Sequence, residues 1–145
     1  MSTRRRRIPA LEERPLFDEE TAEHLESLFK VLANSTRIRM VQALHAAGEL
    51  SVGEIAGRVG MSQQAVSNQL QRLVDRRIVR PRREGNRILY RIIDPCVPAL
   101  LDHGVCFVEQ VALEDGGEEL RAFVDATRGL TASPRPRVRK RSGSA

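Results

Sequence analysis

Two helical patterns separated by a three-residue turn constrain the fold of this chain more than any other feature of its sequence. In the first pattern, apolar residues recur at the spacing of one helix face: Val52, Ile55, Ala56 and Val59. The pattern stops at Gly60, and after Met61 and Ser62 a second run, Gln63 to Arg76, repeats the same apolar period. A short helix, a tight glycine-containing turn and a longer helix predict a helix-turn-helix.

The segments on either side complete a mainly α-helical domain with one small β-hairpin. Glu19 to Phe29 and Thr36 to Ala47 have helical apolar spacing. Ile78 to Arg83 and Arg87 to Ile93 are β-prone runs that flank Gly85-Asn86, which favours a hairpin turn. A hairpin that directly follows the longer helix predicts a winged helix-turn-helix.

The amino-acid composition excludes several classes of protein. A length of 145 residues suits one domain, and four Phe, one Tyr and no Trp exclude an aromatic-rich core. Two cysteines cannot make a disulfide scaffold. No window reaches the roughly 18 uncharged apolar residues of a membrane span, and the run Arg4 to Arg7 does not precede an apolar signal core. We therefore expect a cytoplasmic protein with no membrane partner.

The net charge of +5 is unevenly distributed along the chain. Residues 1–15 and 131–145 are basic and proline-containing, so we expect disordered arms there and one folded domain at 16–130. The folded part is acidic except between Arg72 and Arg91, where eight arginines and two acids give a net charge of +6. A basic stripe on an acidic body is typical of a protein that binds a polyanion, although many charge runs are only solvated surface.

The longer helix and the hairpin carry the candidate contacts to double-stranded DNA. Opposite its apolar stripe, the helix has amides and hydroxyls, which donate to and accept from base edges, where a solvated helix would have Glu and Lys. The arginines near the hairpin turn would reach the sugar-phosphate backbone or the minor groove. The predicted DNA-binding residues are Ser62, Gln63, Gln64, Ser67, Asn68, Gln71, Arg72, Arg82, Arg83 and Arg87.

Three motifs carry a family resemblance: Leu32-Ala33-Asn34-Ser35-Thr36-Arg37-Ile38-Arg39, Ser62 to Leu70, and Leu89-Tyr90-Arg91. Together they resemble the ArsR/SmtB family of small bacterial winged-helix repressors over about residues 20–112. The resemblance implies a homodimer in which the first and last helices pack across the two-fold axis. It also implies that the paired longer helices enter successive major grooves of a palindromic operator. Many family members release DNA when a metal or metalloid binds.

The regulatory sites of the family are not present as such in this sequence. Where one family site has Cys-x-Cys before the longer helix, this chain has Ser51-Val52-Gly53. The other site has Asp-x-His on the last helix, followed by His-x-x-Glu or His-x-x-His from the partner subunit. At those places this chain has Asp94-Pro95-Cys96, and then Phe107 and Gln110.

The two cysteines offer a replacement site. Cys96 and Cys106 are ten residues apart, about 15 Å along a helix, so one helix cannot bring both to one ion or join them in a disulfide. If the last helices cross antiparallel near residue 101, position 96 faces position 106 of the partner. Cys96 with Asp94 from one subunit, and Cys106 with His103 from the other, would then suit Zn, Cd, Pb or Hg, or arsenite.

Simpler interpretations fit the same residues. Asp94 before Pro95 suits a helix N-cap, and cysteines on an apolar helix are often core residues. The thiols of opposite subunits could instead form a redox switch, or the protein could bind DNA without sensing anything. An enzyme is the least supported class, because the sequence has no nucleophile with a base, no paired acidic cleft and no phosphate-binding glycine loop.

Overall fold

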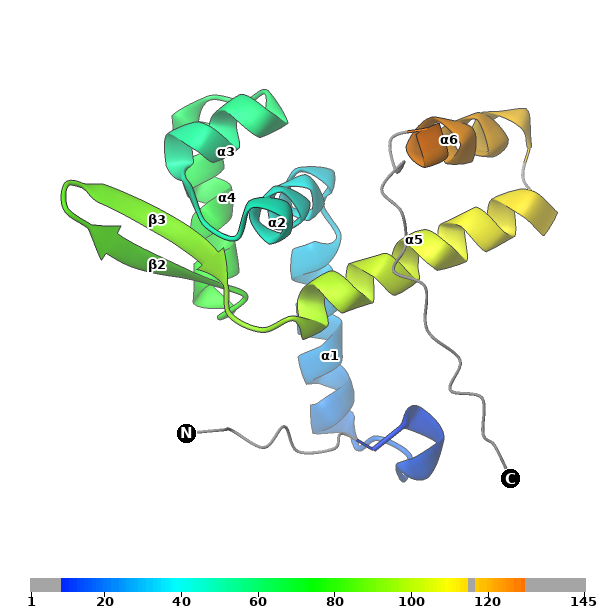
Figure 1. The fold of residues 1–145 in the computed structure, drawn as a ribbon. Coiled ribbons are helices and arrows are strands. Elements are labelled where there is room, and N and C mark those ends of the chain that lie inside the picture. Colours follow the sequence, from blue (N-terminus) through cyan, green and yellow to red (C-terminus); the bar gives the residue numbers. More distant parts are fainter. Residues whose placement is uncertain (1–8, 115–116, 130–145) are drawn as a thin grey trace, which may run out of the picture. The chain divides into compact units, whose positions relative to one another are not determined.

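A computed structural model of the protein describes residues 9–114 and 117–129. In this part of the chain the fold is mainly α-helical with one small sheet (Figure 1). It forms two units, Met1–Ala99 and Leu100–Ala145. The elements are η1 (Leu11–Glu13), α1 (Glu19–Leu32), α2 (Ser35–Ala47), β1 (Leu50–Ser51), α3 (Val52–Val59), α4 (Gln63–Asp75), β2 (Val79–Glu84), β3 (Arg87–Ile92), α5 (Cys96–Glu114) and α6 (Glu118–Gly129).

Polar caps define where the helices of the first unit begin. The side chains of Asp18 and Asn34 accept the amides of Thr21 and Arg37, at 2.8 and 3.0 Å, at the starts of α1 and α2. Ser62 caps α4 in the same way. Such caps satisfy amides that have no partner within the helix.

The core of the first unit lies where α2, α3 and α4 meet. Each of these helices turns an apolar stripe inward, as the periodic patterns predict. The buried residues of the three helices are Met40, Val41, Leu44, Ile55, Ala56, Val59, Val66, Leu70 and Leu73. At the C-terminus of α3, Gly60 adopts a left-handed conformation with φ of 70°, which closes the helix and starts the turn into α4.

Two arginines of the Leu32–Arg39 motif connect α2 to its neighbours. Arg37 donates to the backbone oxygen of Val31 on α1 and, at 2.7 Å, to the side chain of Gln69 on α4. Arg39 donates to the backbone oxygen of Val59 at the end of α3, at 3.0 Å. In this chain the motif therefore fixes the positions of α1, α3 and α4 around α2.

The sheet has three antiparallel strands in the order β1-β3-β2. Glu84 pairs with Arg87 at the end of the hairpin, and Gly85 has φ of 58° at the first position of the two-residue turn, as a type II′ turn requires. The sequence predicted the hairpin but not the third strand, β1. Two residues are too few for a strand pattern, and Leu50 becomes a strand residue only by pairing with Tyr90.

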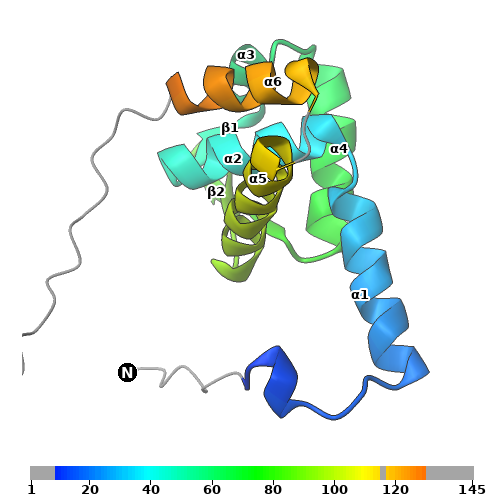
Figure 2. The same ribbon diagram turned by 90° about the vertical axis from the view of Figure 1, so that its right-hand side faces the viewer.

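α1 projects from the rest of the first unit in both views (Figures 1 and 2), and it keeps part of its apolar stripe exposed. Leu25 and Phe29 are 37% and 51% exposed. The helix also runs three residues past Phe29, where the sequence pattern was expected to end, to Leu32, which is buried. The unpacked residues mark α1 as a surface that lacks a partner within this unit.

The second unit consists of most of α5 and of α6, which the sequence analysis did not predict as a separate helix. Ala112 and Val124 are buried, whereas several large apolar side chains on α5 are exposed: Val105, Phe107, Val108, Val111 and Leu113. By length and composition, α5 is apolar enough to span a membrane, the one such helix in the described ranges. Helices that pack in the core of soluble proteins share this character, and α5 also carries Asp102 and Glu109.

The predicted basic arms fall largely outside the described residues, which begin at residue 9 and end at residue 129. Within the predicted N-terminal arm, the short 3-10 turn Leu11–Glu13 is present. Its ends are held by two hydrogen bonds, from the Ala10 amide to the Glu13 carboxylate and from Arg14 to the backbone oxygen of Pro9.

Candidate nucleic-acid interface

The polar face of α4 is exposed along its length and its amides are paired with neighbours one turn away. Gln64 donates to Asn68 at 3.2 Å, and Gln71 donates to Asp75 at 2.7 Å. Ser67 lies between them and is exposed. These side chains form one surface because residues three and four apart share a helix face. The structure therefore brings together four of the predicted contacts: Gln64, Ser67, Asn68 and Gln71.

The two residues at the start of α4 have local roles as well. The Ser62 hydroxyl accepts the Ala65 amide at 3.2 Å and so fixes the first turn of the helix. The Gln63 amide group lies against α3, because a Cβ added to Gly53 would sit 3.4 Å from its Nε2 atom. Both residues are exposed.

Arg72 lies at the edge of the polar face of α4, one helix turn after Asn68. It is one of four basic residues around a hollow of about 320 Å³, which lies on the side of α4 that faces α1 and α2. The basic residues are Lys30, Arg37, Arg72 and Arg76, and Asp75 lines the same hollow. Because Arg72 lies one helix turn before Arg76, these two residues share that flank of α4.

The arginines of the wing, β2 and β3, differ in what they contact. Arg82 donates twice to Glu49, from Nε at 3.0 Å and from Nη2 at 2.7 Å, and its Nη2 lies 3.6 Å from Glu84. The Nη2 atom of Arg87 lies 3.3 Å from the Glu54 carboxylate. Among the described residues Arg83 has no ion pair or side-chain hydrogen bond. The three wing arginines that the sequence grouped together are therefore not equivalent.

The pKa values of the acids beside the wing follow from these contacts. The hydrogen bond from Arg82 is the main cause that lowers the pKa of Glu49, and the same pair raises the pKa of Arg82. Glu54 accepts the Ser51 amide at 2.8 Å in the capping box of α3, and this bond is the main cause of its lowered pKa, with Arg87 a smaller one. Both carboxylates are therefore ionised at neutral pH beside the wing.

Sequence reasoning missed Glu49 and Glu54 as part of this interface. Glu49 is 33 residues before Arg82, and their pairing depends on β1 adding to the sheet beside β3. The signal that was available is the capping box, Ser51 followed three residues later by Glu54, which places that carboxylate at the start of α3.

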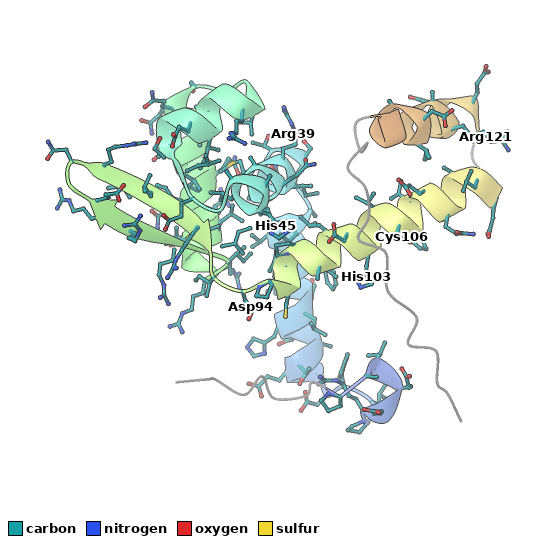
Figure 3. All side chains as sticks on the ribbon, in the orientation of Figure 1. Arg39, His45, Asp94, His103, Cys106 and Arg121 are labelled. Carbon is teal, nitrogen blue, oxygen red and sulfur yellow. The ribbon has the colours of Figure 1, made fainter. Side chains whose placement is uncertain are left out.

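The candidate metal ligands do not form a site within the described part of one chain. Cys96 and Cys106 are both exposed and neither is in a disulfide. The carboxylate of Asp94 accepts the Cys96 amide at 2.7 Å, which is the helix-start role that its place before Pro95 predicts. His103 and Cys106 lie one turn apart on α5 (Figure 3). No group of three His, Cys, Asp or Glu side chains comes close enough to hold an ion in the residues described.

Several known proteins are similar to this chain in sequence and in fold. Residues 32–82 match the helix-turn-helix domain family. The HTH-type transcriptional regulator KmtR of Mycobacterium tuberculosis is 40% identical over 78 residues, which cover 54% of this chain and 58% of KmtR. NmtR, an HTH-type transcriptional regulator from the same organism, is 33% identical over 96 residues, which cover 66% of this chain and 79% of NmtR. The chain thus spans little more than half of KmtR and a larger share of NmtR.

Solved structures match over a greater share of the chain. The AntR antimony-specific transcriptional repressor is 50% identical, with a TM-score of 0.64 over 75% of this chain and 98% of AntR. The homodimeric winged helix-turn-helix DNA-binding domain of Mb0332 from Mycobacterium bovis is 29% identical, with a TM-score of 0.58 over 72% of this chain and all of that domain. These relatives are named as DNA-binding domains, regulators or repressors, in agreement with the expectation that the chain is not an enzyme. The winged helix-turn-helix prediction is confirmed, and the chain belongs to the ArsR/SmtB family of transcriptional repressors.

Proposed function

We propose that this protein is a homodimeric repressor that binds a palindromic DNA operator and releases it when a thiophilic ion binds between the subunits. The observation that carries the DNA-binding part is the exposed row of amides and hydroxyls on α4 beside a wing rich in arginine. Amide side chains can pair in a bidentate manner with adenine, and hydroxyls can pair with any base edge. The relatives named as regulators support the same role.

In this proposal α4 reads the bases and the wing supplies affinity for the backbone. Gln64, Ser67 and Asn68 lie at the centre of the exposed face, where they can enter a major groove. Gln64 and Asn68 are hydrogen-bonded to each other, so DNA bases can replace that bond without leaving a buried polar group unsatisfied. The arginines of the wing carry charge but no base-specific geometry.

Two exposed apolar surfaces support a homodimer. Leu25 and Phe29 on α1, and Val105, Phe107 and Val111 on α5, are each more than a third exposed. Large apolar side chains that are exposed together mark interaction surfaces. The matching domain of Mb0332 is described as homodimeric. A second copy of this chain is therefore the proposed partner for α1 and α5, and such a dimer presents two copies of α4 to the operator.

The effector site that we propose uses Cys96 of one subunit and Cys106 of the other. Both thiols are exposed, so they are accessible to an ion and are not fixed in the core of the chain. His103 can add a nitrogen ligand next to Cys106, whereas Asp94 is already engaged at the start of α5. Soft thiolate ligands favour Zn, Cd, Pb, Hg and the trivalent metalloids. Because AntR is antimony-specific by name and 50% identical, we add antimonite to arsenite among the metalloids.

The decisive experiment is operator binding by the full chain in the presence of each candidate ion. DNA selected from a random pool would bind the wild type, and one of the thiophilic ions would release it. Cys96→Ser and Cys106→Ser should each still dimerise and bind the selected DNA but lose the release. Release that persists in both variants would contradict the thiol site while leaving DNA binding intact.

A mixed dimer sharpens the stoichiometry of that experiment. With Cys96→Ser on one chain and Cys106→Ser on the other, both lesions fall in the same one of two sites, so the dimer should bind one ion where the wild type binds two. Two tight sites in the mixed dimer would contradict ligands from opposite subunits. A covalent dimer on a non-reducing gel, with release by an oxidant and by no ion, would favour the redox switch instead.

A further inference from the structure

The two faces of the wing have different surroundings. Directly paired residues of antiparallel strands point to the same side of a sheet, so the register assigns Arg82, Leu89 and Arg87 to one face, and Arg83 and Ile88 to the other. Leu89 is buried, so the first face covers the protein body. Ile88 is 47% exposed, so near the tip the second face is open to solvent.

On the covered face, two carboxylates from outside the wing hold two of its arginines. Glu49 precedes β1 and receives two hydrogen bonds from Arg82, the bidentate geometry in which a guanidinium binds a carboxylate best. Glu54 in the first turn of α3 lies 3.3 Å from Arg87. These four residues, with Glu84, Leu89 and Arg91, line one open hollow under the wing.

We propose that Glu49 and Glu54 are positioning residues that hold Arg82 and Arg87 against the protein body and leave Arg83, of these three arginines near the wing tip, as the one that contacts DNA phosphate. This inference rests on the DNA-binding function proposed above and refines it. An arginine that neutralises a phosphate must first leave its carboxylate. The carboxylate left behind would then repel the phosphates, so the pairs at Arg82 and Arg87 oppose DNA contact by those residues.

Glu54 is held more firmly than a surface acid would be. Its carboxylate accepts the Ser51 amide at 2.8 Å, and the Ser51 hydroxyl in turn accepts the Glu54 amide. This capping box ties the Glu54 side chain to the start of α3. Arg87 would therefore lose its pair by moving toward DNA, because Glu54 cannot follow it without releasing the cap.

Salt dependence of DNA binding distinguishes an arginine that contacts phosphate from one that only holds the wing. The logarithm of affinity falls with the logarithm of salt concentration by about 0.9 for each phosphate neutralised. With selected operator DNA and the full chain, Arg83→Gln should lower this slope by about 0.9, and Arg82→Gln should leave it unchanged. Arg121→Gln, an exposed arginine on α6, is the matched control for loss of one positive charge.

Glu49→Gln gives the opposite result if the proposal holds. Released from its carboxylate, Arg82 becomes free to bind phosphate, so the slope should rise by about 0.9 and the affinity should fall about threefold more than that of the wild type between 50 and 200 mM salt. Glu23→Gln, an exposed acid on α1, controls for overall charge. Equal slope losses in Arg82→Gln and Arg83→Gln, or a slope that does not rise in Glu49→Gln, would overturn the proposal.

A measurement without DNA keeps this inference separate from the proposed function. Amide hydrogen exchange across the β2–β3 ladder should quicken in Arg82→Gln and Glu49→Gln and stay unchanged in Arg83→Gln, because only the first two lose the pair that holds the wing. Equal exchange in all three variants would overturn the positioning role. A wild-type chain that binds no DNA at low salt would reject the proposed function, and with it the assignment of Arg83, while the exchange experiment would still decide the role of Glu49.

Discussion

The recognition helix α4 and the wing formed by β2 and β3 both carry candidate DNA contacts, but different forces hold them in place. α4 is fixed by apolar burial, since Val66, Leu70 and Leu73 are at most 1% exposed. In β2, five of the six residues are exposed, and near its tip the wing depends on its hydrogen-bond ladder and on ion pairs at the surface. Buried apolar contacts are strong and exposed ion pairs are weak. The helix is therefore rigid, whereas the wing can adjust at little cost.

The largest effect should come from the buried face of α4. Leu70→Ala removes a side chain that is 1% exposed and leaves a cavity where α2, α3 and α4 meet, so the free energy of unfolding should fall by about 2–5 kcal/mol. Chemical denaturation followed by circular dichroism measures this loss. Gln64→Ala on the opposite face is the control and should change stability little. A loss below 1 kcal/mol for Leu70→Ala would contradict a tightly packed recognition helix.

The next effect concerns base preference rather than stability. Asn68→Ala removes one of the central amides of the polar face, and a bidentate amide–base contact gives about 1–3 kcal/mol of discrimination between base pairs. Binding to a panel of operator variants should therefore become flatter at one position of each half-site. Gln42→Ala, on the exposed side of α2, should leave the preference unchanged. If Asn68→Ala weakens all variants equally, the residue contacts backbone and not bases.

A pair of glycine substitutions compares the wing turn with α3, the helix that packs against α4, in their dependence on local conformation. Gly85 has φ of 58° in the wing turn, so Gly85→Ala should destabilise the protein by about 1 kcal/mol. Gly57 lies within α3 with nothing within 4 Å of an added Cβ, so Gly57→Ala should stabilise it by roughly 0.5–1 kcal/mol. Thermal unfolding measures both, and effects of the same sign would contradict this assignment of the turn.

The smallest expected effect is a loss of stability at acidic pH. Because pairing with Arg82 lowers the pKa of Glu49 below its ordinary value of 4.5, the stability from this pair is fully present above that value and is lost as the pH falls through the lowered one. The wing near Glu49 should respond to this titration, because Arg82, Arg91 and Glu84 line the same hollow as Glu49. NMR shifts of the wing amides should follow this titration in the wild type and not in Glu49→Gln.

Sequence patterns predicted the elements whose stability is local and missed those that depend on pairing at a distance. Apolar periodicity located α2, α3 and α4, and Gly85-Asn86 located the hairpin turn. β1 and the Glu49–Arg82 contact could not be predicted, because they arise only once the hairpin lies beside the start of α3. α6 is an exception: it was missed although Leu120, Phe123 and Val124 have the apolar spacing of one helix face.

In the candidate site, too, the residues placed by local geometry could be predicted and those placed by distant packing could not. The polar face of α4 could be predicted because helix geometry alone brings Gln64 and Asn68 together. Arg72 was assigned to that face from its place near the end of the helix, but the packing of α1 and α2 forms the hollow that it lines. The thiol site depends on a second subunit, so Cys96 and Cys106 remain a prediction.

The most direct test of base reading by α4 is a salt series of DNA binding by this chain, with selected operator DNA and a scrambled duplex of the same length and composition. The operator should bind tighter than the scrambled duplex at every salt concentration, by a ratio that falls sharply in Asn68→Ala. In Arg83→Gln, both duplexes should lose affinity equally. Equal binding of the two duplexes by the wild type would contradict a recognition helix that reads bases.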